Sequence, residues 1–295
     1  MASNKLTLLK NAKLMPLIGS MDSFTAGIYT EDNQFVLDSL IHRGKEADLF
    51  ETTIRLEGTY IFGGYLFAHF GHFIWESLAR LYAICQCKNY PILFLTPSSK
   101  LHSPFQVLFD AVNLKNSIYL VKQPTSVENL IFSQPGSSLS PLYITEHQIE
   151  SLARFNFYNT IIDKKIWLSR SKLQYGKIIN EVEIEEQLKR KGFTIIHPEY
   201  LSLREQVKLI STSRIVAGFD GSAFYSSLFS RKLNGAFFVF NRRKSIPEAL
   251  LYALEKKEVK HHKNRVDVQL VSGGGAGADF LVLNPEDIVT TLCSV

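Results

Sequence analysis

The feature that most constrains the fold is an alternation of short apolar segments with helix-like segments between residues 165 and 255. Runs of four or five apolar residues bounded by turn residues are typical of strands buried on both faces of a parallel sheet. The segments between them have helical periodicity, and one opens with the capping-box pair Ser202 and Glu205. The pattern indicates an α/β fold. It predicts strands at 165–169, 193–196, 215–217 and 236–240, and helices at 181–191, 202–210, 222–229 and 246–255.

The first half of the chain shows the same alternation less clearly. Its first sixty residues predict only short irregular strands and loops. After them we expect helices at about 67–85, 105–112 and 146–161, strands at 92–95, 118–121 and 130–132, and a loop at 97–99. A chain of 295 residues suits two domains of this kind. We therefore expect an N-terminal α/β domain at 1–160 and a C-terminal α/β domain at 161–295.

Composition narrows the class of protein. A hydrophobic content of 45% is enough for large cores, and a net charge of +5 suits anionic substrates but not a dedicated nucleic-acid binder. Three cysteines form no disulfide framework. No apolar leader is visible, and no stretch has the roughly 18 apolar residues needed to span a bilayer. We expect a cytoplasmic protein, with association at the inner face of the cell membrane left open.

A polar stripe marks the first predicted helix of the chain. His69, His72, Glu76 and Arg80 fall within one narrow arc of an ideal helix whose opposite face is apolar. Such a group offers a general base, a residue that orients it and an anion anchor. Two other interpretations stay open, an internally satisfied His–Glu–Arg network and a metal site. The spacing differs from the zinc motif His-Glu-x-x-His, so we expect no metal.

A strand end in the second half predicts an anion site. Arg170 ends a strand, Lys177 follows in a loop, and Asn180-Glu181 opens a helix. In α/β sheets, ligands bind at the carboxyl ends of strands, where helix N-termini favour phosphate. Arg170 and Lys177 would bind phosphates, and Glu181 would bind ribose hydroxyls. The alternative is a solvated basic loop.

A second turn, Gly218-Phe219-Asp220-Gly221-Ser222, has the same strand–turn–helix form. Gly221 and Ser222 would let backbone amides approach a phosphate. Asp220 would face a sugar or reacting hydroxyl, or simply cap the helix. The glycine run 273–277 precedes a predicted strand, so it indicates a hairpin or flexible loop rather than a dinucleotide site.

Together these motifs resemble glycosyltransferase family 61. The resemblance is carried, in order, by Gly71-His72-Phe73…Glu76…Arg80, Leu168-Ser169-Arg170…Asn180-Glu181, Gly192-Phe193, Leu201–Val207, Ile215–Gly218 and Asp220–Ala223, through to Leu228-Phe229, within residues 63–240. The chain departs from many members in two places. It has Asp220-Gly221-Ser222 where they have His-Gly-Ala, and Lys177 where they have Arg.

The resemblance implies two Rossmann-like domains facing a cleft, the GT-B type. It implies an inverting transferase that uses a nucleotide-sugar, a saccharide or glycolipid acceptor, and no obligatory metal or other cofactor. The lack of an anchor points to the bacterial members that build capsule and surface polysaccharides.

On this basis the second domain would bind the donor through Arg170, Lys177, Asn180, Glu181, Gly221 and Ser222. The first would supply the base, His72 or Glu76, with His69 and Arg80 on the acceptor side. His69, His72, Glu76 and Asp220 all qualify as the base. The rival function is a non-catalytic nucleotide- or sugar-binding protein, which the altered position 220 favours. A third is a metal-dependent hydrolase at His69, His72 and Glu76.

Overall fold

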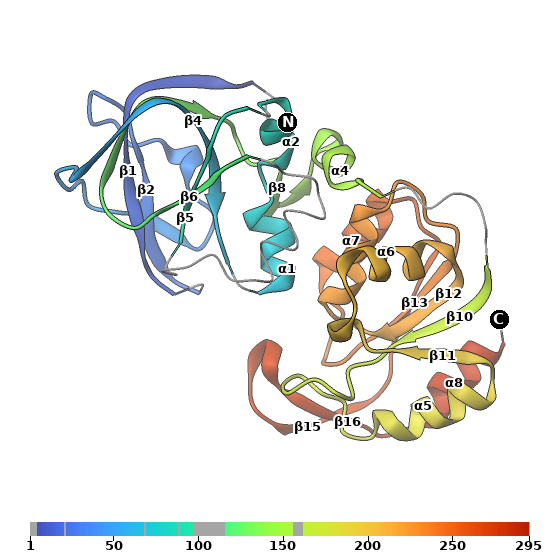
Figure 1. Cartoon of the computed structure of the whole chain (residues 1–295). Coiled ribbons are helices and arrows are strands. Elements are labelled where there is room, and N and C mark those ends of the chain that lie inside the picture. Colours follow the sequence, from blue (N-terminus) through green and yellow to red (C-terminus); the bar gives the residue numbers. More distant parts are fainter. Residues whose placement is uncertain are drawn as a thin grey trace. The chain divides into compact units, whose positions relative to one another are not determined.

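The computed structural model describes residues 5–20, 22–67, 69–87, 89–96, 116–155 and 162–294 (Figure 1). The chain divides into two compact units, Met1–Leu152 and Ala153–Val295. Both units are α/β. The loop expected at 97–99 and the helix expected at 105–112 lie outside the described residues.

A seven-stranded mixed sheet forms the framework of the first unit, in the order β3-β2-β1-β7-β4-β5-β6 (Figure 1). Strands β4, β5, β6 and β7 run parallel, whereas β1 is antiparallel to both β2 and β7. The strands are β1 (Thr7–Gly19), β2 (Phe24–Tyr29), β3 (Gly44–Glu46), β4 (Ile54–Tyr65), β5 (Ile92–Leu95), β6 (Ile118–Val121) and β7 (Thr125–Phe132). A separate two-stranded sheet pairs β8 (Ser137–Leu139) with β9 (Leu142–Ile144).

The first sixty residues are more regular than the sequence predicted. Strand β1 has 13 residues and is exposed at both ends and buried between them, whereas β4 has 12 residues and begins exposed and ends buried. Polar residues such as Lys10, Lys13 and Glu57 interrupt their apolar pattern because parts of these strands face water. The expectation of short irregular strands was therefore wrong here.

The helix expected at 67–85 is broken into three pieces. Short α1 (Phe70–His72) runs into a π-helical segment η2 (Phe73–Ser77), and α2 (Leu81–Gln86) begins only after a turn. Leu78 and Arg80 leave the helical backbone region, with φ/ψ of −90°/7° and −109°/17°. Residues beyond Glu76 therefore no longer lie on the helical face that the sequence predicted for the polar stripe. The helix expected at 146–161 is also shorter, because α4 is Glu146–Leu152.

A five-stranded parallel sheet forms the centre of the second unit, in the order β11-β10-β12-β13-β14 (Figure 1). One face carries a core with α5 and α8, and the other a core with α6, η4 and α7. The strands are β10 (Ile162–Leu168), β11 (Phe193–Ile196), β12 (Ser213–Phe219), β13 (Ala236–Phe240) and β14 (His261–Asn264); the helices are α5 (Glu181–Arg190), α6 (Leu203–Thr212), 3-10 helix η4 (Ser222–Phe229), α7 (Glu248–Lys256) and α8 (Pro285–Cys293).

This strand order places a topological switch point between β10 and β12, because the chain leaves β10 for β11 on one side and returns to β12 on the other. Ligands of open α/β sheets bind at such a point, outside the carboxyl ends of the strands. Gly218 on β12 permits the close approach of β10, since an added Cβ would lie 2.8 Å from the Leu168 carbonyl oxygen. The fold thus brings Arg170 and Asp220 to one edge.

The sequence predicted this unit well. Its strands at 165–169, 193–196, 215–217 and 236–240, its helices and the capping box of Ser202 and Glu205 are confirmed. The glycine run lies in a hairpin between β15 (Val268–Ser272) and β16 (Asp279–Val282), as expected. The sequence missed β14, whose residues His261-His262-Lys263-Asn264 are polar because the strand lies at the sheet edge.

Candidate functional site

Four charged side chains from three strand ends meet at the carboxyl edge of the parallel sheet in the second unit. Arg170 follows β10, Asp220 follows β12, and Arg242 and Arg243 follow β13. We call this group the arginine cluster. Its members are distant in sequence but adjacent in the sheet, so the fold alone assembles them.

Asp220 lies at the middle of the arginine cluster and is only 1% exposed. Its Oδ1 accepts a hydrogen bond from the Arg242 backbone N–H at 3.2 Å and lies 3.6 Å from Arg242 Nε, while Oδ2 lies 3.7 Å from Arg243 Nε. Burial raises the pKa of Asp220, and the surrounding guanidinium groups oppose that rise. Asp220 is thus a counter-ion among cations rather than a helix cap.

The three arginines differ in how they are held. Arg242 Nη1 donates to the Ala278 carbonyl at 3.0 Å, and burial together with the neighbouring Arg170 lowers the pKa of Arg242 to about 10. Arg170 Nε donates to the Gly176 carbonyl at 2.8 Å, and burial lowers the pKa of Arg170 as well. The Arg243 side chain is 36% exposed, against 4% for Arg242. Arg243 therefore presents the accessible positive charge of the cluster.

Gly221 and Ser222 lie beside Arg170. A Cβ built on Gly221 would collide with Arg170 Nη1, so the glycine leaves room for the guanidinium. Ser222 opens η4 at the same sheet edge and is half-buried. The structure thus brings Arg170, Asp220, Gly221 and Ser222 together at this end of the sheet, and their roles in donor binding stay a prediction.

Glu181, expected to bind ribose, is turned inward. Its side chain has no exposed surface, and Oε1 accepts from Trp167 Nε1 at 2.9 Å. Both carboxylate oxygens accept from the Arg170 backbone N–H, at 3.1 and 3.0 Å. Burial raises the pKa of Glu181 to about 8. The carboxyl group holds the loop that presents Arg170, while its ribose role stays a prediction without geometric support.

Lys177 and Asn180 both bond to β16, Lys177 through its backbone and Asn180 through its side chain. The Lys177 backbone N–H donates to Asp279 Oδ1 at 2.8 Å. Asn180 Nδ2 donates to the Val282 carbonyl at 2.9 Å, and the Val282 N–H donates back to Asn180 Oδ1 at 3.0 Å. The Asn180 side chain therefore clamps β16 rather than facing the sheet edge.

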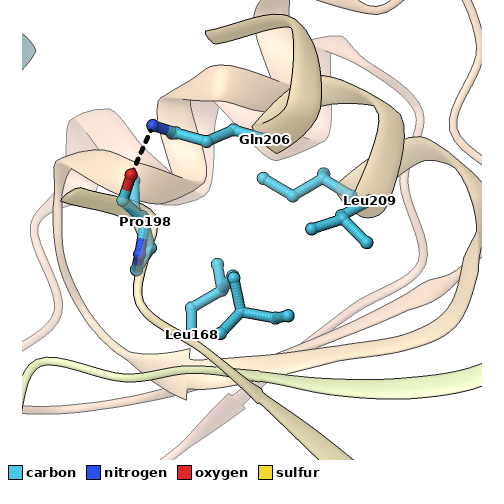
Figure 2. Close-up of a pocket in the computed structure, with 7 residues that line it drawn as sticks. Leu168, Pro198, Gln206 and Leu209 are labelled. Carbon is cyan, nitrogen blue, oxygen red and sulfur yellow. Dashed lines mark hydrogen bonds between the residues drawn. The ribbon is translucent and has the colours of Figure 1, made fainter. Parts of the chain in front are cut away.

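A shallow apolar pocket lies between the ends of β10 and β11 and helix α6 (Figure 2). The amide of Gln206 is its polar feature, and Figure 2 shows that amide bonded to Pro198. Gln206 Nε2 donates to the Pro198 carbonyl at 2.8 Å, and Gln206 Oε1 accepts from Ser226 Oγ at 2.9 Å. The pocket consequently offers apolar contact but no unused polar group of this side chain.

A second polar group lies in the first unit, around η2, the π-helical segment that follows β4. Glu76 is 2% exposed, and its carboxylate faces His42, Arg43 and His72. Glu76 Oε2 accepts from Arg43 Nη2 and lies 2.8 Å from His72 Nδ1, while Oε1 lies 3.9 Å from His42 Nδ1. We call these four residues the Glu76 cluster. The His69 ring packs against that of His72, with centroids 5.1 Å apart.

Arg80 does not join the Glu76 cluster. Its side chain is fully buried, with Nε donating to the Ser133 carbonyl at 2.9 Å and Nη2 to the Asp38 carbonyl at 2.7 Å. Its guanidinium also lies over the Phe62 ring at 4.8 Å. The turn after Leu78 rotates Arg80 away from the expected stripe, so the structure separates it from His72 and Glu76. An acceptor-side role for Arg80 has no exposed surface to act through.

Sequence reasoning missed His42, Arg43, Arg242 and Arg243. For Arg242 and Arg243 a signal was present, because this basic pair follows the predicted strand 236–240 after one residue, Asn241. His42 and Arg43 gave no comparable signal. They reach Glu76 across 33 or more residues of sequence through the pairing of β2 with β3.

The described part of the chain contains neither a group of side chains suited to a metal ion nor a helix suited to crossing a membrane. Among its residues no three His, Cys, Asp or Glu side chains gather in an arrangement suited to a metal ion, so the metal-site interpretation of His69, His72 and Glu76 gains no support. None of the helices in these ranges is long and apolar enough to cross a membrane.

Comparison with known proteins identifies the family. The family model of glycosyltransferase 61 matches residues 70–235, which include His72, Glu76, Arg170 and Asp220. No curated protein matches the chain. Arg43, Arg242 and Arg243 lie outside the matched segment. The match spans more than half of the chain, and the chain therefore belongs to glycosyltransferase family 61.

Proposed function

We propose that this chain is an inverting glycosyltransferase that transfers a sugar from a nucleotide-sugar donor to a saccharide or glycolipid acceptor in surface polysaccharide synthesis. Family membership supplies the glycosyltransferase activity and implies the two substrates. We also propose that the transfer is inverting, that the two units form a GT-B arrangement and that the reaction needs no metal. The product would be a surface polysaccharide, made in the cytoplasm.

The arginine cluster is the observation that carries the donor assignment. Arg170, Arg242 and Arg243 lie at the switch point of the parallel sheet around one buried carboxylate. Guanidinium groups recognise phosphate oxygens by charge-assisted and often bidentate hydrogen bonds. Positive charge at this place would bind the donor diphosphate and stabilise the negative charge that develops on it as it leaves. Asp220 would keep the guanidinium groups apart and in place before the donor arrives.

Nucleotide binding tests this assignment. Calorimetric titration of the protein with UDP, GDP, CDP and dTDP should show micromolar-range binding of at least one of them. Arg170→Ala and Arg243→Ala should each weaken that binding about ten- to a hundredfold, since a charge-assisted hydrogen bond contributes on the order of 1.5–3 kcal/mol.

Arg190→Ala is the matched control. Arg190 is exposed in the last turn of α5, just before the amino end of β11 and away from the carboxyl ends where the arginine cluster lies. The control should therefore bind nucleotide as the wild type does. Unchanged affinity in folded Arg170→Ala and Arg243→Ala proteins would contradict the phosphate assignment.

Turnover separates the enzyme from a binding protein of the same fold. Transferases slowly transfer their donor sugar to water, and released nucleoside diphosphate measures that reaction. Binding without any release, from a panel of nucleotide-sugars, would favour the non-catalytic alternative.

A further inference from the structure

The Glu76 cluster contains several groups that could accept a proton, and its geometry distinguishes among them. The inference rests on the proposed function, because an inverting transfer needs a group that takes the proton of the acceptor hydroxyl. The contacts within the cluster single out one atom as the acceptor of that proton.

Glu76 is positioned to act as an ionised carboxylate. The Arg43 guanidinium donates to its Oε2, and an opposite charge at such short range stabilises the charged form. Arg43 is itself held with 14% of its side chain exposed, its guanidinium 5.3 Å from the centre of the Phe67 ring. Glu76, at 2% exposure, is too enclosed to meet a sugar directly.

The contact between Glu76 and His72 then determines where the histidine carries its proton. An ionised carboxylate has only hydrogen-bond acceptors, so His72 Nδ1 must donate across the 2.8 Å contact to Oε2. A neutral His72 with its proton on Nδ1 has its lone pair on Nε2. The His72 side chain is 26% exposed, so it reaches solvent where Glu76 does not.

We propose that His72 Nε2 is the proton acceptor of the transfer and that Glu76 is a positioning residue that fixes its tautomer. The acceptor oxygen forms a bond to the anomeric carbon as the bond from that carbon to the diphosphate oxygen breaks. The diphosphate departs with the electron pair, and the hydroxyl proton moves to His72 Nε2. The imidazolium so formed faces the Glu76 carboxylate, which stabilises its charge.

The other candidates fit this task less well. Asp220 is 1% exposed and faces guanidinium groups. Burial lowers the pKa of His42, and its Nδ1 is 3.9 Å from Glu76, beyond hydrogen-bond distance. The His69 ring packs against the His72 ring, with centroids 5.1 Å apart.

The tautomer of His72 can be measured without any substrate. Long-range proton–nitrogen NMR of the ¹⁵N-labelled protein distinguishes protonated from unprotonated ring nitrogens, and the His72→Asn spectrum assigns the signals. The proposal expects the neutral His72 ring to be protonated on Nδ1 in the wild type. In Glu76→Ala the proton should move to Nε2, the nitrogen that free histidine favours. A wild-type proton on Nε2 would overturn the proposal without reference to any variant.

A turnover assay tests the proposal independently of the NMR experiment. His72→Asn should lower nucleoside diphosphate release from the nucleotide-sugar about 10²- to 10⁴-fold and leave nucleoside diphosphate affinity unchanged. His147→Asn, on an exposed side chain of α4, is the control and should match the wild type. A wild-type rate in His72→Asn would overturn the inference alone, whereas a wild-type protein that binds no nucleotide and releases none would overturn the proposed function.

Discussion

Glu181 shows how a single buried carboxyl group ties the candidate donor site to stability. It bonds both Trp167 and the backbone of Arg170 with no exposed surface of its own. The sequence placed Glu181 correctly at a helix start after a strand, yet its direction depends on the buried Trp167 beneath it. A motif can locate a residue, whereas the packing around the residue decides which way its side chain turns.

Because Glu181 is buried, we can predict the direction in which pH changes the free energy of unfolding. The pKa of Glu181 rises from 4.5 to about 8 on folding, so between these values the unfolded chain ionises while the folded chain keeps its proton. The free energy of unfolding should fall as pH rises through this window, by up to about 1.4 kcal/mol per pH unit from this group.

Glu181→Gln should remove that slope, because the amide stays neutral and its oxygen still accepts hydrogen bonds. Urea unfolding at pH 5, 6, 7 and 8, followed by Trp167 fluorescence in a Trp75→Phe background, compares the two proteins. Parallel pH profiles of the two would show that Glu181 titrates as an exposed carboxyl does.

Among the elements, α5 and β16 depend on each other through Asn180. This residue precedes α5 and makes two hydrogen bonds to Val282, 102 residues away. Its own helix receives no side-chain cap from it. The sequence could show that Asn180 opens a helix, but not that a hairpin near the C-terminus would take its amide.

Asn180→Ala therefore separates a structural role from donor binding. The variant leaves the N–H and carbonyl of Val282 without their partner and should lower the free energy of unfolding by about 1–3 kcal/mol. Nucleoside diphosphate affinity should stay the same in calorimetry of the folded variant. The control is Asn284→Ala, an exposed asparagine that makes no cap to α8. A tenfold loss of nucleotide affinity with full stability would restore the donor-binding role instead.

At the scale of the whole molecule, the two units differ in how far the sequence predicts them. The second unit has strands covered on both faces, so each is a nearly continuous apolar run such as Ala236–Phe240. In the first unit, β7 pairs with β4 from a segment some 70 residues away, and β1 joins the sheet antiparallel. Such long-range pairing leaves little local trace. For the same reason Arg43 could not be predicted beside Glu76. Arg80 was misplaced for a different reason, because an ideal helix does not include the turn after Leu78 that directs Arg80 away from Glu76.

The division of the chain into two units also predicts which segments a bound donor nucleotide should protect from amide exchange. Its phosphates would bind the arginine cluster, which is built from strand ends of the second unit alone. Ligand binding stabilises the segments that it contacts, and this slows their local opening and amide exchange. Hydrogen–deuterium exchange with and without a saturating nucleoside diphosphate should therefore show protection in the loops around 169–177, 220–223 and 241–243. Peptides around the Glu76 cluster, at 42–46 and 69–77, should exchange as in the free protein. Protection confined to those first-unit peptides would instead place the nucleotide at the Glu76 cluster and leave the arginine cluster without its proposed ligand.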